Sequence, residues 1–130
     1  MMKAAIATLL TATLVTAGTA HAGLVGNQPV TIWTDGSGQP SANGALRDAR
    51  FSADATQYIG CSRYAYDSGS NMIVCYARTA TGAYLSCQTS DPGMVRVAET
   101  LNSAAYLYFV VNPDGYSCDR VISVLASFHL

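Results

Sequence analysis

Basic residues are scarce in this sequence, and lysine is nearly absent. The 130 residues contain seven Lys or Arg and eight Asp or Glu, which gives a formal net charge of −1 at pH 7. The lysine is Lys3, and the arginines are scattered along the chain. Nucleic-acid binding needs a basic stripe that displaces counterions from phosphates. The composition therefore argues against nucleic acid as a main partner.

Long hydrophobic runs are missing except near the N-terminus. Lys3 precedes an apolar stretch from Ala4 to about Val15, and Ala20-His21-Ala22 follows as a small-x-small cleavage pattern. This order is typical of a bacterial secretory signal peptide. A membrane anchor is the alternative, but the run is short and threonines dilute it. We expect residues 1–22 to be a cleaved signal peptide. Residues 23–130 are then a single secreted or periplasmic domain with no membrane insertion.

Closely spaced cysteine pairs are also missing, which argues against a structural zinc site. Such sites typically use pairs about two to four residues apart. Here 13, 11 and 30 residues separate Cys61, Cys75, Cys87 and Cys118 in turn. An even number of cysteines in a small exported domain predicts two disulfides instead.

Recognisable catalytic motifs are absent: the chain has neither a Gly-x-Ser-x-Gly elbow nor a His-Glu-x-x-His sequence. A small secreted hydrolase would have to use His129 with Glu99 or an aspartate as acid and base. The simpler interpretation is a solvated histidine near the chain end. We expect no enzyme, no cofactor and no metal site, with His129 and Glu99 as weak catalytic candidates.

Three turn-like stretches, TDGSG, DSGSN and NPDG, carry oxygen atoms that calcium could use. None has the spacing of an EF-hand loop. Asp, Asn, Ser and Gly also favour turns for backbone reasons, so we interpret these stretches as turns.

Periodicity predicts an α+β fold in which a small antiparallel sheet packs against one main helix. The sheet is a three-strand meander plus a C-terminal hairpin, and disulfides stabilise it. We expect strands near 29–34, 57–66, 72–79, 83–88, 104–111 and 116–128, a loop over 35–44, and a short helix or helical turn within 45–55. The main helix lies within 90–103, where Ser90 or Asp91 can cap it and Pro92 suits its first turn. Its apolar face is Met94, Val97, Ala98 and Leu101.

Strand alternation divides the meander of residues 57–88 into two faces. If each hairpin has a three-residue loop, Cys61 lies opposite Cys75, and Cys75 lies opposite Cys87. This small, apolar face suits packing under the helix. Two pairings stay open: Cys61–Cys75 with Cys87–Cys118, or Cys75–Cys87 with Cys61–Cys118. A Cys61–Cys87 bond would skip the middle strand and ranks last.

The other face of the meander is rich in tyrosine. It carries Tyr58, Tyr64, Tyr66, Tyr76 and Tyr84, with Arg78 at its end. Exposed tyrosines offer flat apolar area with polar tips, which can bind a protein or a glycan. Alternatively, these rings pack beneath Trp33, Phe51 and the 45–55 segment.

The sequence thus predicts a non-enzymatic binding or interaction module for an unknown protein or glycan. The small hydrolase using His129 is one alternative, and a subunit of an extracellular assembly is the other. The oligomeric state stays open.

Overall fold

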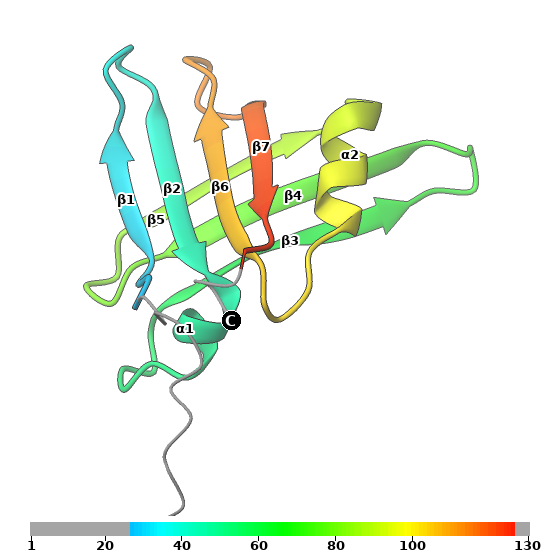
Figure 1. Cartoon of the computed structure of the whole chain (residues 1–130). Helices are drawn as coiled ribbons and strands as arrows, with labels where there is room; N and C mark the ends of the chain where they lie inside the picture. Colours follow the sequence, from blue (N-terminus) through cyan, green and yellow to red (C-terminus); the bar gives the residue numbers. More distant parts are fainter. Residues whose placement is uncertain (1–26, 127–130) are drawn as a thin grey trace, which may run out of the picture.

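The computed structural model describes residues 27–126, which form two antiparallel sheets and two helices (Figure 1). The first sheet has the order β1-β2-β6-β7, with β1 (Thr31–Thr34), β2 (Pro40–Ala45), β6 (Tyr106–Val111) and β7 (Cys118–Val124). The second has the order β3-β4-β5, with β3 (Tyr58–Ala65), β4 (Asn71–Arg78) and β5 (Tyr84–Thr89). The helices are α1 (Leu46–Arg50) and α2 (Pro92–Glu99). The predicted signal peptide and His129 lie outside the described residues.

The two sheets lie face to face, and their strands cross (Figure 1). Side chains from both sheets form one hydrophobic core, in which Ile73, Leu107 and Phe109 are fully buried. Helix α2 lies beside β7 and packs on β7, β3 and β4. The α+β class and the disulfide-stabilised sheet are confirmed. However, most of the small meander face packs against the first sheet, and α2 covers only part of it.

The predicted loop over residues 35–44 is wrong in its second half. Pro40–Ala45 is strand β2, which pairs with β1 on one side and β6 on the other. The turn is confined to Asp35–Gln39, closed by a hydrogen bond from the Asp35 N–H to the Gln39 carbonyl at 2.9 Å. Small residues make β2 resemble a loop in composition. Their size suits a central strand packed on both faces, and Ser41 and Ala42 are fully buried.

The last strand is shorter at both ends than the predicted 116–128: it begins later and ends earlier. The Asp114 carboxylate accepts hydrogen bonds from the backbone N–H groups of Tyr116 (2.8 Å) and Ser117 (2.9 Å). These bonds keep both residues in the turn, so β7 starts at Cys118 and runs to Val124.

The predicted short helix within 45–55 is present as α1.

The meander has the predicted register. The three-residue loops 67–69 and 80–82 close its hairpins, which places Cys61 opposite Cys75 and Cys75 opposite Cys87. Of the two open pairings, the structure contains Cys61–Cys75 and Cys87–Cys118. The first links neighbouring strands, and the second links β5 to β7 across the two sheets.

Helix α2 is capped by Asp91, whose carboxylate accepts a hydrogen bond from the Met94 N–H at 2.9 Å. Its most buried residues are Val95 and Ala98. The predicted face included Ala98 but omitted Val95, because α2 contacts two surfaces, β7 and the β3–β4 strands, instead of one. Among the described residues, no helix is long and apolar enough to cross a membrane.

Candidate functional site

The predicted tyrosine residues all lie on the side of the second sheet that faces away from the core. We call this set the tyrosine face. It consists of Tyr58, Tyr64, Tyr66, Tyr76, Arg78 and Tyr84. Alternation along the strands explains the placement, because Ile59, Ile73 and Ala77 on the opposite side are buried.

One end of the tyrosine face forms an ordered cluster. Tyr58 on β3, Arg78 on β4 and Tyr84 on β5 lie directly opposite one another in a single cross-strand row. Tyr58 is 40% exposed and Tyr84 is 57% exposed. Arg78 is exposed between them. Two strand spacings separate the tyrosines, so their Cα atoms lie roughly 10 Å apart. We call Tyr58, Tyr76, Arg78 and Tyr84 the row cluster.

Tyr76 is fixed within this cluster by three neighbours. Its ring contacts Tyr58 edge to face, with 5.9 Å between ring centroids. It lies over Gly60, where an added Cβ would be 3.8 Å from the ring. Its hydroxyl is 3.2 Å from the Ser62 hydroxyl. These contacts fix the position of one ring of the cluster.

Tyr64 and Tyr66 are not part of this cluster. They lie towards the β3–β4 turn and are 45% and 49% exposed. Tyr64 is six residues from Tyr58 along β3, a distance of roughly 20 Å. Ser62 and Val74, which pair across the strands, lie between the two ends. The structure therefore divides the tyrosine face into two separate ends.

The alternative in which the tyrosines pack beneath Trp33 and Phe51 is wrong. Trp33 belongs to the other sheet, where its ring stacks on Tyr108 at 5.7 Å with an interplanar angle of 17°. Phe51 is 76% exposed. The Trp33–Tyr108 pair does not follow from the sequence pattern, because β2, whose composition predicts a loop, lies between their strands.

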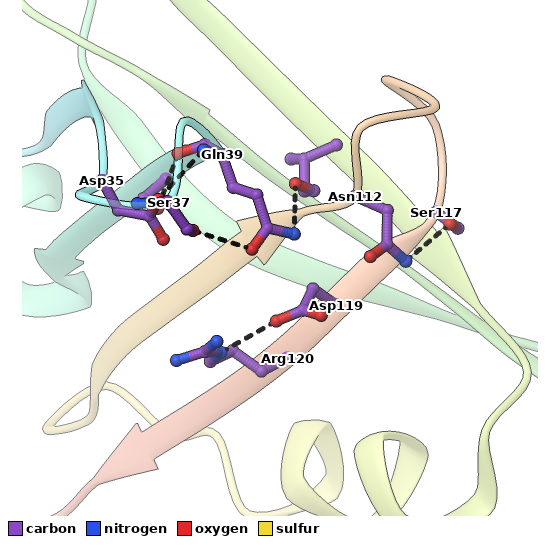
Figure 2. Close-up of polar contacts among 9 residues, drawn as sticks. Asp35, Ser37, Gln39, Asn112, Ser117, Asp119 and Arg120 are labelled. Carbon is purple, nitrogen blue, oxygen red and sulfur yellow. Dashed lines mark hydrogen bonds and ion pairs between the residues drawn. The ribbon is translucent and has the colours of Figure 1, made fainter.

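The aspartates at two of the predicted turns organise the backbone. Figure 2 shows the Asp35 turn beside the turn that follows β6. Hydrogen bonds from the Ser37 hydroxyl and the Gln39 N–H lower the pKa of Asp35. The hydroxyl and backbone N–H of Ser117 likewise lower the pKa of Asp114. In TDGSG and NPDG, the carboxylates therefore serve the turns. Within residues 27–126, no group of three or more His, Cys, Asp or Glu could hold a metal ion.

Charged partners are few in the described part of the chain. Its one ion pair joins Arg120 to Asp119 at 2.9 Å (Figure 2). Arg78 thus has no carboxylate partner there. Glu99, the weak catalytic candidate, is the exposed last residue of α2. Its proposed partner His129 lies outside the described residues, so this pair stays a prediction.

Comparisons with known proteins add no assignment: no family model, curated protein or solved structure matches the chain.

Proposed function

We propose that this protein is an exported, non-enzymatic binding module that holds a glycan chain on the row cluster. The observation that carries the proposal is the cross-strand row of Tyr58, Arg78 and Tyr84, in which two exposed tyrosines flank an arginine that has no carboxylate partner within residues 27–126. The two disulfides are compatible with an extracellular or periplasmic location.

The shape of the cluster favours an extended ligand. Aromatic rings offer flat apolar area, which matches the C–H faces of sugar rings, and their hydroxyls can bond to sugar hydroxyls. Tyr58 and Tyr84 are far enough apart to contact different sugar units of one chain. The edge contact between Tyr58 and Tyr76 limits the ring motion that would otherwise be lost on binding.

The charge of the cluster favours an acidic glycan. Arg78 lies at the centre of the row, and a guanidinium binds carboxylates through two parallel hydrogen bonds. We therefore expect stronger binding of uronic-acid chains than of neutral chains, and weaker binding as salt rises.

Titration with oligogalacturonate and with neutral cello-oligosaccharide tests the proposal, with amide NMR shifts as the readout. Oligogalacturonate should shift the signals of β3, β4 and β5 at the row cluster. Tyr84→Ala and Arg78→Gln should each weaken binding about tenfold. Phe51→Ala, which removes another exposed aromatic ring directly after α1, is the control and should leave binding unchanged.

Two results would contradict the proposal. One is binding that Tyr84→Ala and Arg78→Gln leave intact. The other is a self-associating protein whose row-cluster signals broaden with concentration in the absence of glycan. That second result would favour a subunit of an extracellular assembly.

A further inference from the structure

A second candidate site lies at α1, away from the tyrosine face. An open pocket of about 690 Å³ is lined by α1 and its following residue, by β3, and by the turn before β6. Its lining residues are Leu46, Arg47, Arg50, Phe51, Ile59, Ser103 and Ala104. The volume is within the range of small-molecule pockets, about 300–1,000 Å³. The other surface hollows described here hold about 320 to 480 Å³.

The pocket combines apolar side chains with positive charge. Leu46, Ile59 and Ala104 supply apolar surface, and Ile59 belongs to the hydrophobic core. Phe51 adds an aromatic side chain that is 76% exposed. A concave, mostly apolar surface with a few charged groups is the usual form of a small-molecule site.

Two arginines bring the charge to the same pocket. Arg47 and Arg50 are three residues apart on α1, a spacing that puts them on one side of a helix. Both are exposed and both line the pocket. The Arg50 guanidinium lies 6.0 Å from the centroid of the Phe51 ring. The apolar body and the charged head of one ligand could thus be bound side by side.

The charge of these arginines is not neutralised by a carboxylate in the described residues, whose one ion pair is at Arg120. The nearest acid in sequence, Asp48, accepts a hydrogen bond from the Gln28 N–H at 2.7 Å. The Asp48 carboxylate thus bonds to the backbone and forms no ion pair with Arg47 or Arg50 in the described residues. The base of the helix is also fixed, because the Leu46 N–H donates to the Ala105 carbonyl at 3.0 Å.

From this arrangement we propose that the α1 pocket binds a small carboxylate with an apolar body, of the size of a medium-chain fatty acid. The two guanidinium groups bind the carboxylate, and Phe51, Leu46 and Ile59 contact the hydrocarbon. This site is independent of the glycan surface, so either proposal can fail without the other.

Calorimetric and NMR titration with decanoate tests the site, with decanol as the uncharged probe. Decanoate should shift the signals of α1, Ile59 and Ala104, and decanol should bind at least tenfold more weakly. The double variant Arg47→Gln/Arg50→Gln should lose roughly tenfold or more in decanoate affinity. Phe51→Ala should weaken both probes.

Matched controls separate this site from the tyrosine face. Arg78→Gln removes an exposed arginine elsewhere and Tyr84→Ala an exposed ring, and neither should change decanoate binding. Equal affinity for decanoate and decanol would overturn the proposal, as would a double variant that binds decanoate normally. The protein could instead form a dimer that dissociates in the double variant but not on addition of decanoate. That result would assign the pocket to a second copy of the chain and overturn the proposal.

Discussion

Cys87 on β5 is bonded to Cys118, the first residue of β7, and their Cα atoms are 5.0 Å apart. A hydrogen bond lies beside this disulfide, because the Gln88 N–H donates to the Tyr116 carbonyl at 3.0 Å. A covalent bond and a backbone bridge thus join the two sheets at one point. The Cys61–Cys75 disulfide, in contrast, links strands that already share a ladder of hydrogen bonds.

Removal of the bond between the sheets should therefore cost more stability than removal of the bond within the meander. The chain-entropy relation gives about 4 kcal/mol for the separation of 31 residues and about 3 kcal/mol for that of 14. Urea unfolding of Cys87→Ala/Cys118→Ala and of Cys61→Ala/Cys75→Ala measures both losses. An equal or larger loss for the second variant would show that strand pairing alone does not hold the hairpin.

Loss of the cap on α2 should destabilise the protein without changing its fold. Asp91 accepts the Met94 N–H, which otherwise has no partner within the helix. Asp91→Ala should lower the free energy of unfolding by about 1 kcal/mol. The neighbouring Ser90→Ala, at an exposed position outside the helix, is the control and should change it by less than about 0.5 kcal/mol. Similar losses in the two variants would contradict the assignment of the cap.

Acid should lower the stability of the protein by protonating Asp54, which lies in the loop before β3. Backbone hydrogen bonds from Gln57 and Thr56 lower its pKa from 3.8 to about 2. Because the folded-state pKa lies below the unfolded value, the stabilisation is complete above about pH 5. It is lost as the pH falls from about 4 towards 2.

Asp54→Asn should therefore flatten the decline of stability between pH 5 and pH 2, as followed by urea unfolding at each pH. Asp67→Asn is the control, since the Asp67 carboxylate has no hydrogen-bond partner within residues 27–126. Unchanged pH dependence in Asp54→Asn would show that other carboxylates dominate the acid response.

The meander was predictable because its information is local. Alternation assigns each side chain to a face, and three-residue loops fix both registers. The cysteine row at Cys61, Cys75 and Cys87 followed from these two features alone. The choice between the two disulfide pairings was not predictable, because it depends on how the two sheets cross and on which meander strand therefore lies beside Cys118 of β7.

The exposure of the tyrosines likewise could not be predicted from local sequence patterns. Alternation shows which face Tyr58 and Tyr84 share, but not whether a later segment covers them. Helix α1 is held against Ala105, far along the chain, and so leaves that face open. The pocket at α1 was missed for the same reason, since residues 46–51, Ile59 and Ala104 come together only in the folded chain.

Strand β2 shows how packing overrides composition, and its Gly44 provides a direct test. A Cβ at Gly44 would lie 3.1 Å from both the Cα and the Cγ2 of Val30, a buried residue whose N–H donates to the Gln57 side chain. Gly44→Ala should therefore cost about 1–3 kcal/mol in urea unfolding, because backbone as well as side chain must move. Gly36→Ala, where an added Cβ meets no atom within 4 Å, should stay within about 0.5 kcal/mol of the parent. Equal stability of the two variants would mean that Val30 and the segment before β1 can move without cost. Close packing would then not explain why β2 consists of small residues.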